Sequence, residues 1–493
     1  MHSLRRLGCF GPVLVVVLIT LALLHACQDT SIPAGPSEGG APGIPGSLSA
    51  APNSSAGQWS APFSWPIVAV HLHLLPDGRV LSWGFHGTPQ LWNPTTGTFE
   101  STASPSLVFC AGHDLMGDGR LFIAGGHVTH NGIGIPDVNV FDYRTSGWTT
   151  LPRMAWGRWY PTAITLADGE VLILAGTDSS GTVVRVPEIW TGSGWHRLDN
   201  ALQLLHYYPR VFVAPGGTVF YAGEDPNTRW LQTTGNAHWI PGPRTRFGDF
   251  RDYGAAVMYE AGRILLVGGG DPPTASAETI DLNIPGPTWR FTGSMAVARR
   301  QLNATVLPDG TVLVTGGTSA PGFNTPSGAV LTAELWNPNT GSWTTLASNA
   351  IPRIYHSTTL LLPDGRVLHT GSGDTDPPAV DQRNAEIYSP PYLFKGARPR
   401  ITGAPGSITY GQQFFVGTPD GPSVARVRLI RLGSTTHAFN AGQRLVTVAF
   451  SQASGGLTVT APGKRPLAPP GYYMLFLVNG VGVPSVSRIL NLQ

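Results

Sequence analysis

The stretch NATVLPDGTVLVTGG, residues 303–317, contains the pattern that decides the fold. An apolar run reaches Leu307, the pair Asp309-Gly310 interrupts it, and a second apolar run from Val312 ends at Gly316-Gly317. An Asp-Gly pair between two such runs is typical of a β-hairpin, because glycine adopts the positive φ that a tight turn requires. The stretch therefore predicts two short antiparallel strands that end at a glycine pair.

Working outward from this stretch, the same unit occurs seven times. The units start at His71, Gly112, Pro161, Arg210, Gly254, Asn303 and Ser357, and their turn glycines are Gly78, Gly119, Gly169, Gly217, Gly262, Gly310 and Gly365. Most units continue into an outer strand with an aromatic residue, as in LWNPNTGSW of residues 335–343. A repeat of about 50 residues with four short strands and a glycine pair is the kelch signature. We therefore predict an all-β chain whose residues 59–390 form a seven-bladed kelch-type β-propeller.

The pattern changes after residue 390. Short alternating runs such as RVRLIRLG and GYYMLFLVN are separated by turns rich in Gly and Pro, over roughly 100 residues. This organisation predicts an immunoglobulin-like β-sandwich over residues 391–493.

The first residues predict export. Arg5 and Arg6 precede an apolar stretch over residues 13–24, which is short for a membrane span and typical of a signal peptide over residues 1–27. The ending LHAC resembles the bacterial lipobox, in which the cysteine, here Cys27, becomes lipidated and tethers the chain to a membrane; a plain signal peptide is the alternative. Residues 28–58 are mainly Pro, Gly, Ser and Ala and predict a disordered linker. We expect an extracellular, cell-surface or periplasmic protein.

Charge and cysteine content exclude some functions. Only 12% of the residues are charged, the formal net charge is +2 and no basic block is present, so we expect no nucleic-acid partner. Cys9 and Cys27 belong to the export segment, which leaves Cys110 as the single cysteine of the body. An exported body with one cysteine has no internal disulfide. Cys110 is either a small buried apolar residue or part of a chemical site.

The repeat also predicts where a site lies. Eight residues before each turn pair, at the start of the inner strand, the chain has a thiol, phenols, an amide and an imidazole instead of the usual aliphatic residues. These register positions are Ala69, Cys110, Tyr160, Tyr208, Tyr253, Gln301 and His356, with Tyr355 directly before the last. Equal register predicts that they share one end of their blades near the axis, with Cys110 and Tyr160 in neighbouring blades. Consecutive side chains diverge on an extended strand, so Tyr355 and His356 could bind one ion only if the chain bends there.

A copper-type metal site needs a second nitrogen donor. His71 and His73 form an H-x-H pair on one strand face, and His437 lies in a Gly/Ser/Thr/Asn-rich loop of the tail. Neither motif alone identifies the missing ligand.

The chain resembles the galactose oxidase and glyoxal oxidase family of copper-radical oxidases over nearly all of its mature length. FCAGHDLMGDGR around Cys110 and GRWYPTAITLADG around Tyr160 resemble the segments with the crosslinking cysteine and the modified tyrosine. RIYHSTTLLLPDG is similar to the segment with the Tyr-His ligand pair, and STTHAFNAGQR to the tail loop with the last histidine. PPGYYMLFLVNGVGVPS resembles the family's C-terminal strand pair, which ends an early-set domain.

The resemblance implies that Tyr160, Tyr355, His356 and His437 bind one copper ion, and that a thioether joins Cys110 to Tyr160. An ortho sulfur substituent makes a phenolate easier to oxidise, so Tyr160 would form a stable radical. Tyr355 would act as the general base for a substrate hydroxyl, and Tyr160 would take hydrogen from the carbon. Dioxygen would then leave as hydrogen peroxide.

The expected substrates are small aldehydes or primary alcohols. In galactose oxidase a tryptophan 18 residues beyond the crosslinked tyrosine covers it, whereas the same count here reaches Asp178. This departure favours the glyoxal oxidase-like branch. Tyr208, Tyr253, Gln301 and His113 are candidate pocket residues, with ordinary packing as the alternative for each. The alternative function is a non-catalytic kelch module that binds glycan or protein, with a free thiol at Cys110.

Overall fold

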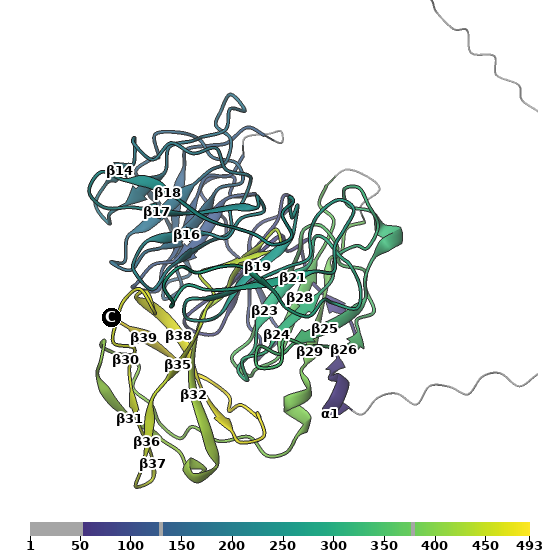
Figure 1. The fold of residues 1–493 in the computed structure, drawn as a ribbon, viewed down its shortest axis with the longest axis vertical. Coiled ribbons are helices and arrows are strands. Elements are labelled where there is room, and N and C mark those ends of the chain that lie inside the picture. The colour runs from purple at the N-terminus through teal and green to yellow at the C-terminus, as the bar shows by residue number, and fades with distance from the viewer. Residues whose placement is uncertain (1–52, 128–131, 376–379) are drawn as a thin grey trace, which may run out of the picture. The chain divides into compact units, whose positions relative to one another are not determined.

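The computed structural model describes residues 53–127, 132–375 and 380–493 (Figure 1). Nearly all regular elements in these ranges are short β-strands, so the prediction of an all-β chain is confirmed. The helical elements are α1 (Asn53–Ala56) and the 3-10 turns η1 (Pro326–Gly328), η2 (Pro391–Phe394) and η3 (Gly421–Ser423). Among the described residues, no helix has the length and hydropathy that crossing a membrane requires. The expected signal peptide, the lipidation site Cys27 and most of the linker lie outside these ranges.

Five sheets are antiparallel meanders of four consecutive strands, and each contains one of the sequence repeats (Figure 1). The first two consist of β7 (Gly112–Leu115), β8 (Leu121–Ala124), β9 (Val138–Asp142) and β10 (Gly147–Leu151), and of β11 (Thr162–Thr165), β12 (Val171–Leu174), β13 (Glu188–Trp190) and β14 (Trp195–Arg197). The next two consist of β15 (Val211–Val213), β16 (Val219–Tyr221), β17 (Asn227–Gln232) and β18 (His238–Arg244), and of β19 (Ala255–Glu260), β20 (Arg263–Val267), β21 (Ala277–Asp281) and β22 (Arg290–Phe291). The fifth consists of β23 (Asn303–Val306), β24 (Val312–Thr315), β25 (Thr332–Trp336) and β26 (Trp343–Ser348).

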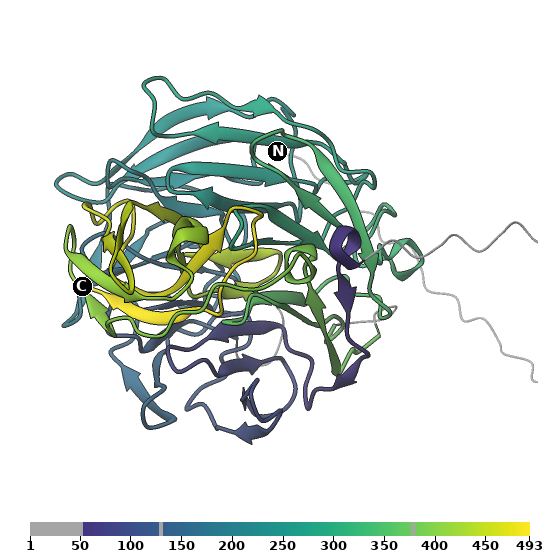
Figure 2. The same ribbon diagram turned by 90° about the horizontal axis from the view of Figure 1, so that it is seen from below.

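Two further sheets combine segments that are distant in sequence. One joins β3 (His71–Leu74), β4 (Val80–Trp83), β5 (Gln90–Trp92) and β6 (Phe99–Ser101) to a hairpin of the tail, β33 (Ser434–Thr436) and β34 (Phe439–Ala441). The other joins β27 (Ser357–Leu361), β28 (Val367–Gly371) and β29 (Asn384–Ser389) to β1 (Gln58–Trp59) and β2 (Phe63–Ser64), seen in purple beside green strands in Figure 2. Residues 53–58, which we expected in the linker, instead form α1 and the start of β1, because Trp59 packs on Tyr388 with ring centroids 4.8 Å apart.

The predicted turns are confirmed. All seven turn glycines have a positive φ, between 77° at Gly262 and 98° at Gly169. In five of the turns an aspartate carboxylate accepts a hydrogen bond from the amide two residues later, as Asp309 does from Thr311 at 3.1 Å. The Asp-Gly pair therefore closes the hairpin through both its side chain and its backbone freedom.

Buried ion pairs recur in four sheets. In each, an arginine just before the first strand pairs with a glutamate of the third strand, and its guanidinium also donates to a carbonyl at the end of the second strand. The pairs are Arg158–Glu188 at 2.8 Å, Arg251–Glu278 at 2.9 Å, Arg299–Glu334 at 2.6 Å and Arg353–Glu386 at 3.3 Å. Each glutamate carboxylate also accepts hydrogen bonds from backbone amides, so both charges of each buried pair are hydrogen-bonded. These pairs fix the segment that leads into each inner strand.

The tail forms two more sheets. One has the order β30 (Ser407–Ile408), β39 (Arg488–Leu492), β38 (Gly471–Asn479), β32 (Val424–Arg431), β35 (Leu445–Val448), and the other β31 (Gln413–Gly417), β37 (Gly456–Thr460), β36 (Phe450–Ala453). Alternate residues of β38 face different cores: Leu475 packs with Val416 and Leu457 of the second sheet, whereas Phe476 packs in the large cluster that contains Leu81. Because strand side chains alternate, the larger tail sheet is buried on both faces.

Candidate metal centre

The register positions share an unusual backbone conformation. Each lies one to three residues before the first strand of its sheet, and six of the seven are non-glycine residues in the left-handed region. Their φ values are 58° for Cys110, 63° for Tyr160, 46° for Tyr208, 52° for Tyr253, 58° for Gln301 and 65° for His356. L-residues rarely adopt this conformation, so its repetition shows that the register positions share one backbone geometry.

Backbone hydrogen bonds connect these positions from sheet to sheet. The amide of Tyr160 donates to the carbonyl of Cys110 at 3.0 Å, and the amide of Tyr208 donates to the carbonyl of Tyr160 at 3.0 Å. The amide of Gln301 donates to the carbonyl of Tyr253 at 2.9 Å. The register inferred from sequence therefore corresponds to a physical chain of contacts between neighbouring sheets.

Tyr355 and His356 face the same side despite being consecutive. Their rings stack with centroids 3.9 Å apart and an interplanar angle of 26°. The left-handed φ of His356 supplies the bend that the sequence analysis required. The hydroxyl of Tyr355 is hydrogen-bonded to that of Tyr160, so the two phenols meet across 195 residues of sequence.

His437 enters from the tail. It forms, with Ala438, the two-residue turn between β33 and β34, and both residues have a positive φ, 46° and 64°, as in a type I′ turn. Because β33 pairs with β3, the turn reaches the register positions. The His437 ring lies 4.6 Å from Tyr160, 5.5 Å from Tyr355 and 4.7 Å from His356, centroid to centroid. The expected loop is thus the tip of a hairpin.

Cys110 completes the group. Its side chain is fully buried, packs in one apolar cluster with Tyr160 and Tyr208, and places Sγ 3.9 Å from Nε2 of His437. The donor atoms of Cys110, His356 and His437 all lie within 4.8 Å of one another. Burial raises the pKa of the thiol well above its usual value. The structure therefore brings all five residues of the expected centre together.

The protonation of both imidazoles follows from their partners. Nδ1 of His356 lies 2.7 Å from the carbonyl oxygen of Gly373, which can only accept, so Nδ1 carries the hydrogen. Nε2 of His356 is then an unprotonated lone pair, and it is buried without a hydrogen-bond partner. Nδ1 of His437 contacts Oγ1 of Thr436 at 2.5 Å, and that hydroxyl donates to the carbonyl of Val70 at 3.0 Å. The Thr436 oxygen thus accepts from Nδ1, so Nε2 of His437 is unprotonated; it faces the Cys110 thiol, and its lone pair can bind a cation.

Burial sets the charge state of these groups. It raises the pKa of Tyr160 and Tyr355 well above the usual value and lowers the pKa of His356 to about 3 and that of His437 well below its usual value. Neutral phenols and neutral imidazoles in a buried site can accept a metal cation, which would favour the phenolate forms.

A tryptophan that the sequence analysis missed covers the tyrosine. The indole of Trp159 stacks on Tyr160 with centroids 3.9 Å apart and planes 13° from parallel. Asp178, the position expected to leave Tyr160 uncovered, is partly buried and holds a turn through Ser180 and Thr182. Asp178 therefore does not cover the Tyr160 ring, and the preceding residue, Trp159, shields the ring instead. The sequence feature that could have indicated this cover is the adjacent pair Trp159-Tyr160.

A small pocket opens onto these residues. It encloses about 80 Å³ and is lined by Tyr160, Tyr208, Tyr253 and His437 together with charged groups that sequence reasoning missed, Arg210, Glu224 and Asp252. Arg210 pairs with Glu224 at 2.7 Å, and burial raises the pKa of Glu224 to about 7.

Two expected pocket residues do not line this cavity. Gln301 is buried with both amide atoms unpartnered, and His113 lies in a separate buried hydrogen-bond network. Phe323, half exposed, contacts Tyr355 with centroids 4.6 Å apart. Of the expected lining, Tyr208 and Tyr253 are therefore the two at the cavity.

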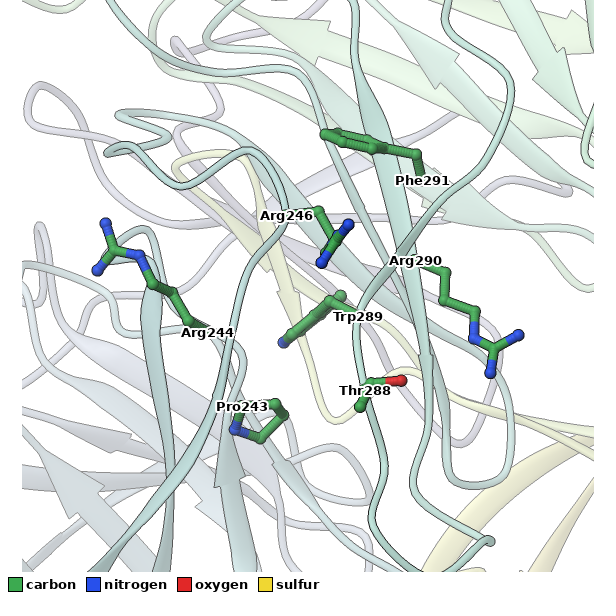
Figure 3. A pocket seen from close by; sticks show the side chains of 7 residues that line it. All are labelled: Pro243, Arg244, Arg246, Thr288, Trp289, Arg290 and Phe291. Atoms are coloured by element: carbon green, nitrogen blue, oxygen red, sulfur yellow. The ribbon is translucent and has the colours of Figure 1, made fainter.

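A larger groove elsewhere lacks metal-binding chemistry. It encloses about 580 Å³ between β18 and β22, and Figure 3 shows Trp289 between Arg246 and Pro243. Its lining is Pro243, Arg244, Arg246, Thr288, Trp289, Arg290 and Phe291. It includes no thiol, carboxylate, phenol or imidazole, whereas the smaller pocket is lined by phenols and an imidazole of the expected centre.

Comparison with known proteins agrees with this geometry. Residues 398–492 match the family model described as galactose oxidase-like, Early set domain, and residues 270–384 match the model of the glyoxal oxidase N-terminus. A galactose oxidase of Gibberella zeae is 30% identical over 491 residues, which cover 89% of this chain and 71% of the relative. An aldehyde oxidase GLOX of Vitis pseudoreticulata is 30% identical over 438 residues, which cover 78% of this chain and 82% of the relative.

A solved structure is also similar to this chain. It is described as a novel fungal alcohol oxidase with catalytic diversity among the AA5 family, in complex with copper. The TM-score is 0.81 at 26% identity, and the match covers 89% of this chain and 100% of that chain. The chain therefore has the galactose oxidase fold, is an oxidoreductase, and belongs to the galactose oxidase and glyoxal oxidase family of copper-radical oxidases.

Proposed function

We propose that this protein is an exported copper-radical oxidase that oxidises small aldehydes or primary alcohols with dioxygen and releases hydrogen peroxide. Tyr160, Tyr355, His356 and His437 hold the copper ion, and Cys110 forms a thioether with Tyr160. One observation carries the proposal: these five side chains, from segments far apart in the sequence, meet in one buried cluster.

The residues fit a copper ion. Two imidazoles whose Nδ1 atoms are engaged present unprotonated Nε2 atoms: that of His437 faces the Cys110 thiol, and that of His356 is buried with no hydrogen-bond partner. Two phenol oxygens lie beside them. Imidazole and phenolate are suitable donors for cupric ion, and no carboxylate competes within this set. The hydrogen bonds of Gly373 and Thr436 orient the imidazoles as outer partners do in metal sites.

The side chains then have distinct tasks. The copper ion would supply one oxidising equivalent and lower the pKa of a bound hydroxyl. Tyr355, as a phenolate, would take the proton of that hydroxyl. Tyr160, as the radical, would take the hydrogen atom from the substrate carbon. Trp159 excludes water from one face of the Tyr160 ring, which would lengthen the life of the radical.

Thioether formation is a two-electron oxidation, and dioxygen, the oxidant of the proposed reaction, can complete it. The Cys110 S–H bond and one ring C–H bond of Tyr160 break, and a C–S bond forms. The two electrons and two protons released reduce dioxygen to hydrogen peroxide. The shared burial of the thiol and the ring supports this pairing.

The pocket supports small substrates. A volume of about 80 Å³ is small beside the roughly 300–1,000 Å³ of pockets that take drug-sized ligands. An aldehyde would react as its hydrate and give a carboxylic acid. The Arg210–Glu224 pair and Asp252 offer hydrogen bonds to the second oxygen of such a hydrate. Relatives named as galactose oxidase and as aldehyde oxidase are equally identical to the chain, and pocket size favours the glyoxal oxidase-like assignment.

We also propose the domain organisation inferred from sequence. The seven sheets that contain the repeats form a seven-bladed propeller within residues 59–390, and the two tail sheets form an immunoglobulin-like early-set domain within residues 391–493. The pairing of β1 and β2 with β29 supports closure of the propeller by its N-terminal segment. Residues 1–27 direct export, with Cys27 as a lipid anchor.

One experiment tests the enzyme proposal. The mature chain is produced copper-free, loaded with cupric ion under air, and digested for mass spectrometry. We expect the peptides of Cys110 and Tyr160 as one crosslinked species two hydrogens lighter than their sum. Separate peptides after loading would contradict the radical-oxidase assignment. Peroxide release against small aldehydes, primary alcohols and galactose then identifies the substrate class.

A further inference from the structure

A buried hydrogen-bond network ends at the backbone of Cys110. Nε2 of His71 accepts from the Cys110 amide at 3.0 Å, and Nδ1 of His71 lies 3.1 Å from Nε2 of His113. Nδ1 of His113 lies 2.6 Å from Oγ of Ser434, which lies 2.7 Å from the carbonyl oxygen of His113. All three side chains are buried, so these contacts have no competition from water.

The two backbone ends of the network fix every proton in it. The Cys110 amide can only donate, so Nε2 of His71 is unprotonated and Nδ1 carries the hydrogen. His71 therefore donates to Nε2 of His113, whose hydrogen is on Nδ1 and is donated to Ser434. The Ser434 hydroxyl donates to the His113 carbonyl, which can only accept. One tautomer of each histidine satisfies all four contacts, and this makes the network rigid.

The network joins three segments that form the metal centre. His71 is on β3, and His113 is on β7, three residues after Cys110. Ser434 is on β33, the strand that leads to His437. His71 lies opposite Thr436 in the β3–β33 pairing. The indole of Trp83 stacks on His71, with centroids 4.7 Å apart and planes 7° from parallel, and holds the ring from its other face.

The Cys110 amide does not donate to the backbone carbonyl of another register residue, as several other register amides do. The amides of Tyr160, Tyr208 and Gln301 donate to the carbonyl of the preceding register residue. For Cys110 that residue is Ala69, whose carbonyl accepts instead from Oγ1 of Thr358. His71 therefore takes the place of a backbone carbonyl for Cys110, as the Glu224 carboxylate does for the amide of Tyr253. Without it, a buried amide in a left-handed conformation would be unsatisfied.

We propose that His71 and His113 are positioning residues for thioether formation: through the Cys110 amide and Ser434 they hold the Cys110 thiol against the Tyr160 ring. This inference rests on the proposed function, because it concerns the crosslink that Cys110 and Tyr160 form there. The residues contact neither substrate nor oxidant, and they act only by holding the thiol in the geometry that the C–S bond needs.

The test compares His71→Phe, His71→Gln and His73→Phe in the full mature chain. Phenylalanine at position 71 keeps the stack on Trp83 and removes the acceptor, whereas glutamine retains an oxygen acceptor near the position of Nε2. His73 is the matched control, because it is equally buried two residues along the same strand and its ring nitrogens have no hydrogen-bond partner. Copper-free protein is mixed with one equivalent of cupric ion in air-saturated buffer, and the crosslinked peptide is quantified over time.

We expect crosslinking at least about tenfold slower in His71→Phe, the equivalent of about 1.4 kcal/mol and the size of one buried hydrogen bond. His71→Gln should recover most of the wild-type rate, and His73→Phe should match the wild type. Equal rates in wild type and His71→Phe, equal slowing in His71→Phe and His71→Gln, or equal slowing in His73→Phe would each overturn the inference. If His71→Phe does not fold, Ser434→Ala decides, and an unchanged rate in that variant overturns it. A wild type that never crosslinks instead contradicts the proposed function.

Discussion

Lowering the pH from 7.5 to 5.5 is expected to destabilise the metal-free protein by up to about 6 kcal/mol, because burial keeps its interior histidines neutral. Burial lowers the pKa of His113 and His356 to about 3 and that of four others well below 6.5. The six histidines are His71, His73, His113, His356, His369 and His437. A lowered folded pKa means that stability is complete above pH 6.5 and is lost as the pH falls toward 3.

The magnitude follows from proton uptake by the unfolded chain. At pH 5.5 each unfolded histidine binds a proton that its buried counterpart excludes, which costs about 1.4 kcal/mol of folding free energy per residue and about 8 kcal/mol for six. Glu224 opposes this trend: burial raises its pKa from 4.5 to about 7, so the folded protein gains about 2 kcal/mol there over the same interval. Burial also raises the pKa of Asp114, Asp252 and Asp309, which act in the same direction as Glu224. The net loss of about 6 kcal/mol is thus an upper figure, and it compares with a typical total stability of about 5–15 kcal/mol.

The assay is urea unfolding of the chelator-treated protein, followed by tryptophan fluorescence at pH 7.5, 6.5 and 5.5. The variant His369→Leu removes one buried imidazole whose nitrogens have no partner, so its loss over the interval should be smaller by about 1.4 kcal/mol. A free energy of unfolding that stays level or rises from pH 7.5 to 5.5 would refute the reasoning. So would a His369→Leu variant with the same loss as the wild type.

Three other outcomes are expected. Arg299→Met should lower the free energy of unfolding by about 3–5 kcal/mol, because it leaves Glu334 buried and unpaired, whereas the half-exposed Arg263→Met should cost about 0–1 kcal/mol; urea titration distinguishes them. Trp159→Leu should shorten the lifetime of the oxidised radical state about tenfold with copper content unchanged, since a stacked ring pair contributes about 0.5–1.5 kcal/mol. The decay of visible absorption measures this lifetime, and an unaltered lifetime would exclude a shielding role for Trp159. His437→Ala should weaken cupric ion binding beyond the 10–100-fold that loss of an outer partner typically costs, as measured by competition with a chelator, and full affinity would remove it from the ligand set.

The repeats made much of the fold predictable. Glycines such as Gly310 have a steric reason to occupy tight turns, so the Asp-Gly pairs marked the hairpins one by one. The β33–β34 hairpin was not predictable, since its residues form a Ser/Thr/Asn/Gly-rich stretch that is read as a loop. It becomes a strand pair because β3 offers an edge to it, and this contact spans more than 350 residues of sequence. Pairing at such a separation leaves no local pattern.

The sequence predicted which side chains of the proposed centre come together, but not the geometry in which they meet. Equal register identified Cys110, Tyr160 and His356 as neighbours, and the structure places them in contact with the same hairpin turn. Register could not show the left-handed backbone at these positions, because none of them is glycine. It also missed Trp159, since the residue next to a register position on an extended strand should point away. The bend at Tyr160 turns the two consecutive rings into a stack.

The left-handed backbone explains how the repeats can bring the side chains of the proposed centre together. An extended entry into each inner strand would send alternate side chains to opposite faces, and Tyr355 and His356 would then diverge. One left-handed residue reverses the chain locally and brings the neighbouring side chains to one side, as the stacked Tyr355–His356 pair demonstrates. Glycine would adopt this conformation at little cost, but it would supply no thiol, phenol or imidazole. The strain of each such residue is of the order of 1–3 kcal/mol and persists only where the surroundings impose it. Here the buried Arg–Glu pairs and the sheet-to-sheet backbone hydrogen bonds impose it, so the same elements that stabilise the repeats also hold the side chains of the centre in place.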